Sequence, residues 1–302
     1  MSPSPPIGPI IFGEVLFDVF PDRSRVLGGA PFNVAWHLQA FGCHPLFISC
    51  VGCDAPGDEI LARMRTWGMR TDGISRAPHR PTGTVTVALH DGQPTFTINP
   101  DQAYDELALP PFDLASSPLL YCGSLCLRTA HARAQFSLLC QRTHAPLFVD
   151  INLRHPWWQP ALVAHLLSQA AWFKCNAQEL HEIASAFNIS APTDDLLAAA
   201  LLSRFPLRAL IVTYGEHGAV WYDPNGTRLS HAPPPVSPFI DTVGAGDAFS
   251  AVVIYGLLKQ LTPDSILARA VAFAAQICSI RGAVPTSRTF YLNFLSNSPD
   301  AC

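Results

Sequence analysis

The feature of this sequence that most constrains its fold is a repeated alternation between short apolar runs and segments with helical spacing. The runs rich in β-branched or aromatic residues predict strands over residues 10–17, 45–51, 119–122, 147–151, 171–175 and 209–213. The segments with helical spacing include residues 31–41, 58–67, 176–186 and 264–280. Strands that alternate with helices in this way form a parallel sheet with crossover helices, so an α/β fold is predicted.

Length and composition indicate one globular unit. Of 302 residues, 49% are hydrophobic and 14% are charged, which is apolar enough to bury a core and too apolar for disorder. Because α/β folds commonly exceed the usual domain size, residues 1–302 are expected to form a single domain. The formal net charge is −4, and no cluster of Lys and Arg interleaves with aromatic residues, so nucleic acid is not an expected partner.

The sequence predicts a cytoplasmic protein without a membrane anchor. Residues 1–20 lack a basic n-region and contain prolines, and Glu14 and Asp18 interrupt their apolar run. This segment is therefore a poor match to a signal peptide. The apolar stretch 248–258 is too short to span a bilayer. The nine cysteines are expected to stay as thiols in a reducing cytosol. Cys50 and Cys53 form an isolated C-x-x-C without a second pair at zinc spacing, which favours structural thiols over metal or redox chemistry.

One region departs from the α/β alternation. Residues 84–89 and 95–98 each alternate between apolar and polar side chains, and Asp91-Gly92 between them is a two-residue turn signal. These residues predict a β-hairpin. A lone hairpin in an α/β chain is either decoration or a lid that closes over a small ligand, and the pattern alone leaves both open.

The stretch at residues 241–247, Asp-Thr-Val-Gly-Ala-Gly-Asp, leads directly into a predicted helix. The free backbone N–H groups at a helix start, together with the positive end of the helix dipole, form a site for phosphate. Gly244 and Gly246 permit a close approach of the anion. An acid in the first turn is also an ordinary cap, so Asp247 alone has two interpretations. Next to a glycine turn, however, an acceptor-only carboxylate suits phosphoryl transfer to a hydroxyl group.

Other phosphate-binding motifs are missing from the sequence. Residues 52–59 have the glycine spacing of a Walker A motif, but Asp58 and Glu59 stand where Lys and Ser or Thr are needed. The His-Arg-Asp catalytic loop of protein kinases is also absent.

Five segments, in order, resemble the ribokinase-like, or PfkB, family of carbohydrate kinases. Residues 241–251 resemble its C-terminal signature, with Val252 as a departure where a small residue is usual, and Gly-Gly-Ala-Pro-Phe-Asn-Val-Ala at 28–35 resembles its sugar-site motif, after a strand that carries Asp18. Three further landmarks match at 150–154, 174–179 and 212–218. The resemblance implies a three-layer α/β/α fold with a mostly parallel sheet and a small β-sheet lid, formed from about residues 16–30 and 83–105.

The resemblance also implies roles for individual residues in an ATP-dependent reaction. Asp247 resembles the base that takes the proton from the acceptor hydroxyl. The amides of residues 244–247 resemble an anion hole, so that Gly244, Ala245 and Gly246 join Asp247 as catalytic residues. Arg154 resembles a phosphate-side catalytic residue. The sugar-binding positions are Asp18, Gly28, Gly29 and Asn33.

On the nucleotide side, the resemblance implies three sets of residues. Asn176 and Glu179 match an Asn-x-x-Glu element that helps to hold Mg²⁺, largely through water. Thr213, Gly215, Gly218 and Gly246 resemble nucleotide contacts, and Asn176 is also implied on the cofactor side. Asp241, with residues 281–283, resembles a loop that holds an activating potassium ion. Val271 replaces an asparagine that many members place near adenine, so apolar adenine contacts are expected.

Each of these residues also has a structural interpretation. Asp18 can cap a turn, Asn33 can satisfy the start of its helix, Arg154 can form a surface ion pair and Glu179 can lie on a solvated helix face. Their joint appearance in the family's order favours a site.

The motif at residues 28–35 resembles the fructokinase branch, because ribose kinases tend to carry lysine at the position of Ala30. Residues 100–105, Pro-Asp-Gln-Ala-Tyr-Asp, also resemble bacterial fructokinases. Phe96 and Tyr104 are candidates for the wall of the sugar pocket, or for core packing. A sister kinase for 2-keto-3-deoxygluconate, another sugar or a nucleoside stays open, as does a regulator that binds sugar and nucleotide without turnover. A lid sheet with an exposed apolar face further predicts a homodimer through the lid.

Overall fold

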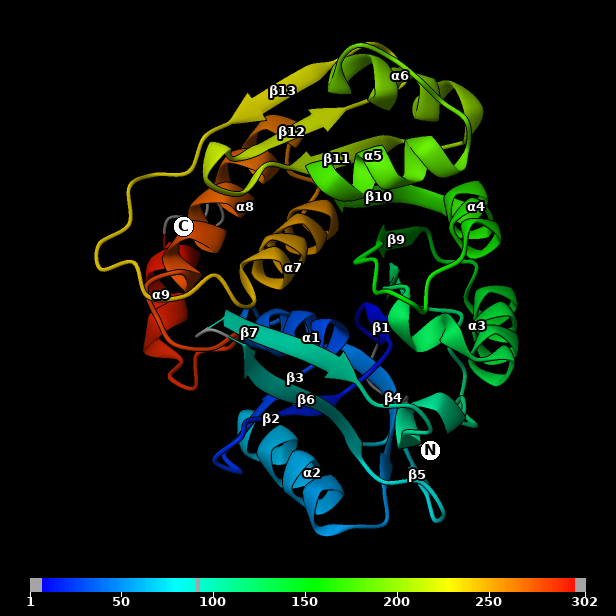
Figure 1. Cartoon of the computed structure of the whole chain (residues 1–302), viewed down its shortest axis with the longest axis vertical. Helices are drawn as coiled ribbons and strands as arrows, with labels where there is room; N and C mark the ends of the chain where they lie inside the picture. Colours follow the sequence, from blue (N-terminus) through cyan, green and yellow to red (C-terminus); the bar gives the residue numbers. More distant parts are fainter. Residues whose placement is uncertain (1–6, 91–92, 297–302) are drawn as a thin grey trace.

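The computed structural model describes residues 7–90 and 93–296, with the side chains of residues 89, 90, 93, 94 and 293 left out, and contains a nine-stranded main sheet (Figure 1). In order along the sheet, the strands are β13 (Arg228–His231), β12 (Ala219–Tyr222), β11 (Ala209–Thr213), β10 (Ala170–Asn176), β9 (Leu147–Asp150), β8 (Leu120–Cys122), β1 (Ile10–Phe12), β4 (Leu46–Gly52) and β5 (Ile74–Ala77). From β11 to β5 all neighbours are parallel, whereas β12 and β13 add an antiparallel edge. The predicted mostly parallel sheet is confirmed.

Helices cover both faces of this sheet, and each face has its own apolar core. The first core is closed by α1 (Ala30–Ala40), α2 (Ala55–Trp67), α7 (Ala245–Leu258), α8 (Pro263–Ile277) and α9 (Thr289–Ser296). The second is closed by α3 (Ala130–Thr143), α4 (Pro160–Gln169), α5 (Ala177–Ala186) and α6 (Asp194–Arg204). Because strand side chains alternate, Ile11 packs in the first core while Ile10 and Phe12 pack in the second. The three-layer α/β/α architecture is therefore confirmed.

A second, four-stranded sheet forms the predicted lid. Its order is β3 (Arg25–Gly28), β2 (Leu16–Val19), β6 (Gly83–His90) and β7 (Gln93–Ile98). Figure 1 shows it in the lower half of the view, whereas β10 to β13 lie in the upper half. The predicted hairpin is the β6–β7 pair, and its Asp91-Gly92 turn lies outside the described residues.

The prediction of one strand over residues 10–17 was wrong. The run is divided into β1 in the main sheet and β2 in the lid. Gly13 donates its N–H to the Ile48 carbonyl at 3.1 Å, and a side chain at Gly13 would collide with the Pro31 ring. The chain then leaves the main sheet, and Leu16 pairs with lid residues instead. An unbroken apolar run cannot reveal this change of partner, because it depends on contacts made by distant residues.

The predicted helices are present, with ends that shift by up to three residues. The helix expected from residue 58 begins at Ala55 because the Asp54 carboxylate accepts the Gly57 N–H and caps it. The helix expected to reach residue 280 ends at Ile277.

Within the described part of the chain, all eight cysteines are free thiols. The same residues contain no group of three or more His, Cys, Asp or Glu side chains that could hold a metal ion, Cys50 and Cys53 included. None of the described helices combines the length and the apolarity needed to cross a membrane.

Candidate active site

The N-terminus of α7 carries the glycine turn and the predicted base. Gly244 is the N-cap with a positive φ of 80°, and a side chain there would collide with Ala283. Asp247 follows in the first turn, and its Oδ2 accepts a hydrogen bond of 2.7 Å from Asn33 Nδ2. This bond joins α7 to α1 across 214 positions of sequence. The Asp247 carboxylate therefore faces Asn33, one of the residues predicted to bind the sugar.

The surroundings of Asp247 make it a stronger base than an ordinary aspartate. Removal of its carboxyl from water raises the pKa to about 6, and the charge of Asp150 acts in the same direction. The hydrogen bond from Asn33 and the charges of Lys174 and Arg154 oppose this rise. A carboxyl with such a pKa is ionised at neutral pH and accepts a proton more readily than one near 4.

The predicted acceptor-side residues come together where β2, β3 and the start of α1 meet. Asp18 lies on β2, and burial raises the pKa of its carboxyl to about 6. Gly28 is buried on β3, where an added Cβ would lie 3.7 Å from Asp18 Oδ2. Gly29 has a φ of 105°, and its Cβ would lie 2.8 Å from the Glu14 carbonyl oxygen. The two glycines therefore allow α1 to begin close to Asp18, which brings Asn33 to the same region.

Arg154 follows β9 on an exposed loop and forms no ion pair with any described residue. Its charge acts on the carboxyls of Asp18 and Asp247. The surface ion pair considered for this residue is thus not observed, and its guanidinium stays available beside the site.

The two aromatic candidates lie in different environments. Tyr104, on the 3₁₀ helix η1 (Ala103–Glu106), is fully buried, yet its hydroxyl has no hydrogen-bond partner among the described residues. Phe96 lies on β7 and is 56% exposed, which rules out core packing. Its place in the pocket wall stays a prediction.

A cavity of about 700 Å³ opens on the other side of the glycine turn. Four of the predicted nucleotide-side residues line it: Thr213, Gly215, Gly218 and Gly246. Asn176, Glu179 and Asp241 do not. Ala245 also lines it, and the apolar part of its wall includes Phe249, Val271 and Ala274. An apolar pocket that ends at a helix N-terminus suits a flat heterocycle joined to phosphates.

Asn176 and Glu179 form a reciprocal cap at the start of α5. Asn176 Oδ1 accepts the Glu179 N–H at 2.8 Å, and Glu179 Oε2 accepts the Asn176 N–H at 2.8 Å. Glu179 Oε1 also accepts the Leu153 N–H at 2.7 Å, which holds the loop before Arg154. Glu179 is buried, so its interpretation as a solvated helix face was wrong. A magnesium ion here would need oxygen ligands from phosphates and water, which is the usual arrangement for this ion.

A buried polar cluster beneath the glycine turn was missed in the sequence. Lys174 Nζ and Ser250 Oγ each donate a hydrogen bond of 2.7 Å to Asp150 Oδ2. Burial acts to lower the pKa of Lys174, but the carboxylates around it, Asp150 first and then Glu179 and Asp247, together raise the pKa. An added Cβ on Gly246 would lie 3.6 Å from Lys174 Nζ, so this ammonium lies against the turn. In the sequence, this cluster could have been found from two charged residues near the carboxyl ends of apolar strands, Asp150 in β9 and Lys174 in β10.

The loop that carries Asp241 packs against the segment that follows α8. Asp241 Oδ1 accepts the Val243 N–H at 3.0 Å, and the Asp241 N–H points to the Cys278 carbonyl at 3.3 Å. Gly244, three residues after Asp241, packs against Ala283.

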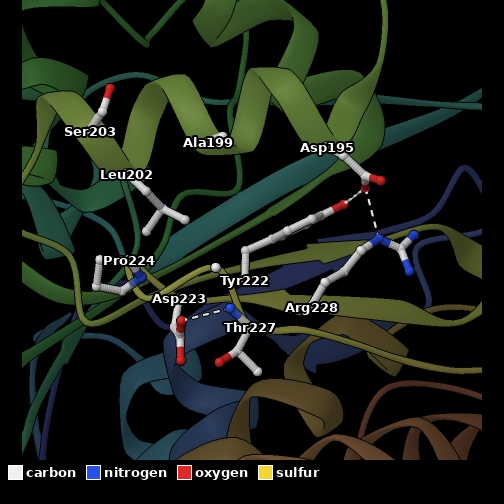
Figure 2. Close-up of a pocket in the computed structure, with 10 residues that line it drawn as sticks. Asp195, Ala199, Leu202, Ser203, Tyr222, Asp223, Pro224, Thr227 and Arg228 are labelled. Carbon is white, nitrogen blue, oxygen red and sulfur yellow. Dashed lines mark hydrogen bonds and ion pairs between the residues drawn. The ribbon is translucent and has the colours of Figure 1, made fainter.

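A separate cavity of about 410 Å³ lies between α6 and the β12–β13 pair (Figure 2). There Asp195 accepts hydrogen bonds from the Tyr222 hydroxyl at 2.7 Å and from Arg228 Nε at 2.9 Å. None of the predicted site residues lines this cavity.

The family model described as pfkB family carbohydrate kinase matches residues 18–289. The chain belongs to this family, and it is an ATP-dependent carbohydrate kinase. Fructokinase-2 of Solanum habrochaites is 28% identical over 312 residues, covering 93% of each protein. The fructokinase of Klebsiella pneumoniae is 32% identical over 292 residues, covering 92% of each.

Solved structures share this fold. A fructokinase from Xylella fastidiosa with bound ATP gives a TM-score of 0.79 at 22% identity, over 95% of this chain and 97% of that one. A putative ribokinase II from E. coli in complex with ATP and Mg²⁺ gives a TM-score of 0.80 at 21% identity, over 97% and 100%. The predicted family and fold are confirmed.

Proposed function

We propose that this kinase is a fructokinase, which converts fructose and ATP to fructose 6-phosphate and ADP. The observation that carries the proposal is the hydrogen bond between Asn33 and Asp247, which links the acceptor side to a base at the glycine turn. The identity to proteins named fructokinase, over more than nine tenths of the chain, supports this acceptor.

In the proposed reaction, Asp247 removes the proton of the 6-hydroxyl group as the hydroxyl oxygen attacks the γ-phosphorus of ATP. The bond to the bridging oxygen breaks, and ADP leaves. The amides of residues 244–247 and the guanidinium of Arg154, which forms no ion pair with a described residue, stabilise the charge on the transferred phosphoryl group. A positioned base of this kind contributes roughly 10²- to 10⁴-fold in rate.

We infer that the 700 Å³ cavity binds ATP through Thr213, Gly215, Gly218 and Gly246, with Val271 in an apolar adenine wall. Bound Mg²⁺ would neutralise phosphate charge, and Asn176 and Glu179 would hold it through water molecules. The packing of Gly244, which follows Asp241 in the same loop, against Ala283 supports a potassium site there. Omission of K⁺ from an assay with a sodium or choline counter-ion tests that site, and unchanged turnover would contradict it.

The reaction is tested by following ADP release from purified protein with fructose and MgATP. Asp247→Ala should lose most of the activity, whereas Asp195→Ala in the cavity of Figure 2 is a matched control that should keep it. Unchanged turnover in Asp247→Ala would overturn the mechanism.

A panel of sugars and nucleosides, ranked by kcat/KM, decides the acceptor. Higher efficiency with 2-keto-3-deoxygluconate, another sugar or a nucleoside would assign the chain to a sister activity. Thermal stabilisation by ligands without ADP release would instead indicate a binding regulator.

We further propose a homodimer through the lid and a cytoplasmic location. The exposed apolar side chains Val26 on β3 and Phe96 on β7 support the dimer, and the free thiols of the described cysteines support a reducing compartment. Light scattering at micromolar protein and cell fractionation test them. A monomer, or recovery with secreted material, would contradict them.

A further inference from the structure

A third cavity, of about 540 Å³, lies between the lid and the main body of the protein. It is bounded by the edge strand β3 of the lid, by the helices α1 and α2, and by the segment that follows α8. The labels of β3, α1 and α2 are in the lower half of Figure 1. None of the residues predicted to bind the acceptor, ATP or magnesium lines this cavity.

The lining of this cavity is positively charged. It contains three arginines and one glutamate, a net charge of +2, whereas the whole chain carries −4. Glu59 on α2 forms ion pairs with Arg25 Nη2 at 2.5 Å and with Arg63 Nη2 at 2.6 Å, which brings these two guanidinium groups together. Arg281, the third arginine, forms no ion pair with a described residue. This concentration of positive charge favours an anion and disfavours a metal cation such as potassium.

The rest of the lining is largely apolar and includes two tryptophans. Trp36 on α1 and Trp67 on α2 stack with their ring centres 4.5 Å apart and their planes 7° apart. Leu27 of β3 and Val284 also line the cavity. Both tryptophans are largely buried, and Arg288 Nη2 donates to the Trp67 carbonyl at 2.6 Å, so this part of the wall is fixed. A rigid apolar wall beside a charged one suits a ligand that combines an anionic and an apolar group.

Residues 281–286 connect this cavity to the glycine turn of the active site. Trp36 Nε1 donates to the Pro285 carbonyl at 2.9 Å, which attaches this segment to α1. Ala283 lines the cavity and also packs against Gly244, the N-cap of α7. The same segment therefore forms a wall of the cavity and supports the turn that is proposed to bind phosphate.

We propose that this cavity binds a phosphorylated small molecule with an apolar group, and that the bound molecule regulates the kinase. The phosphate accepts hydrogen bonds from Arg25, Arg63 and Arg281, because a guanidinium group presents paired N–H donors to two phosphate oxygens. The apolar group contacts the wall formed by Trp36 and Trp67. The bound phosphate neutralises positive charge next to the segment that supports Gly244, so the attraction of the active site for ATP falls.

Binding is measured by isothermal titration calorimetry with phenyl phosphate, which has one phosphate and one flat apolar ring. MgADP and fructose are present at saturating concentrations, because they occupy the proposed reaction site and cannot react with each other. Inorganic phosphate and phenol, titrated separately, represent the two parts of the probe. Each should bind about tenfold more weakly than phenyl phosphate, since each lacks one of the two contacts.

Two variants test the location of the bound probe. Arg63→Gln and Arg281→Gln should each weaken the binding of phenyl phosphate about tenfold, because each removes charge-assisted hydrogen bonds to the phosphate. Arg65→Gln is the matched control and should bind like the wild type, since Arg65 is also exposed on α2 but does not line the cavity. Melting temperatures of all three should match that of the wild type, because exposed ion pairs contribute little to stability.

Regulation is measured as the effect of phenyl phosphate on KM for ATP. In the wild type, KM should rise about fivefold and then level off as the probe saturates, because ATP and the probe bind at the same time. A probe that competed for the ATP site would raise KM without a limit. In Arg281→Gln, the same concentrations of probe should leave the KM of that variant nearly unchanged.

The binding site is refuted if phenyl phosphate fails to bind at millimolar concentrations, or if it binds equally to the wild type, Arg63→Gln and Arg281→Gln. The regulatory role is refuted if the bound probe leaves KM for ATP unchanged, or if the rise in KM never levels off. A wild type that phosphorylates no sugar would instead contradict the proposed function, and calorimetry would still decide whether the cavity binds the probe.

Discussion

At the scale of single residues, burial of the Asp247 carboxyl sets the pH range in which it can accept a proton. Because its pKa is raised to about 6 and only the ionised form accepts a proton, kcat/KM should fall about tenfold for each pH unit below 6 and level off above it. A profile of kcat/KM against pH with a saturating ATP concentration measures this. Activity that stays constant down to about pH 4.5 would contradict it.

Glu14 should destabilise the folded protein when it is ionised. Burial raises its pKa from 4.5 to about 7, so the folded chain binds a proton more tightly than the unfolded chain, and stability falls as pH rises through this range. A tenfold change in proton affinity corresponds to about 1.4 kcal/mol, so Glu14→Gln should gain roughly 3 kcal/mol above pH 8 and little below pH 4. Denaturant unfolding at both pH values measures the gain, and an equal effect at the two would refute the cause.

At the scale of elements, the start of α7 has two glycines with different constraints. Gly244→Ala should lower the free energy of unfolding by about 2 kcal/mol or more, because φ is positive there and the methyl group would collide with Ala283. Gly246→Ala is the matched control. Its methyl group meets only Lys174 Nζ, at 3.6 Å, so the melting temperature should be unchanged. Gly246 lines the 700 Å³ cavity proposed for ATP, so KM for ATP should rise several-fold. Equal melting temperatures for the two variants would contradict this account.

The Asp150 cluster ties β9, β10 and α7 together. Lys174→Met should destabilise the protein by about 3 to 5 kcal/mol, because it leaves Asp150 buried without its counter-charge. The pair Lys174→Met with Asp150→Asn should recover much of this stability in denaturant unfolding, without recovering turnover. If the pair is no more stable than Lys174→Met alone, the loss has another cause.

The order of elements and the residues that approach Asp247 were predictable, because they depend on local patterns and on the resemblance to a family. The Asn33 motif and the glycine turn each have a sequence signal, and the fold brings them together as expected. The burial of Glu14 and the burial of Lys174 were not predictable. Both features arise only when distant elements cover these two side chains and exclude water from them. The sequence pattern around a charged residue does not indicate whether the residue is buried or exposed.

At the scale of the whole molecule, the lid presents apolar side chains to the outside. Val26→Arg on β3 should shift a lid-mediated dimer towards monomer in light scattering, because it would place a charge in a desolvated interface. Leu138→Arg on α3 is the matched control, since Leu138 is 44% exposed and Val26 is 43% exposed. If both variants keep the mass of the wild type, the lid is not the interface.

The hydrogen bond between Asn33 and Asp247 joins two parts of the chain that have different proposed roles in the active site. The residues predicted to bind the acceptor lie between Asp18 and Tyr104, whereas the lining of the cavity proposed for ATP begins at Thr213. Substitutions in the N-terminal segment alone could therefore change the acceptor specificity in evolution, while the proposed binding of ATP stayed the same.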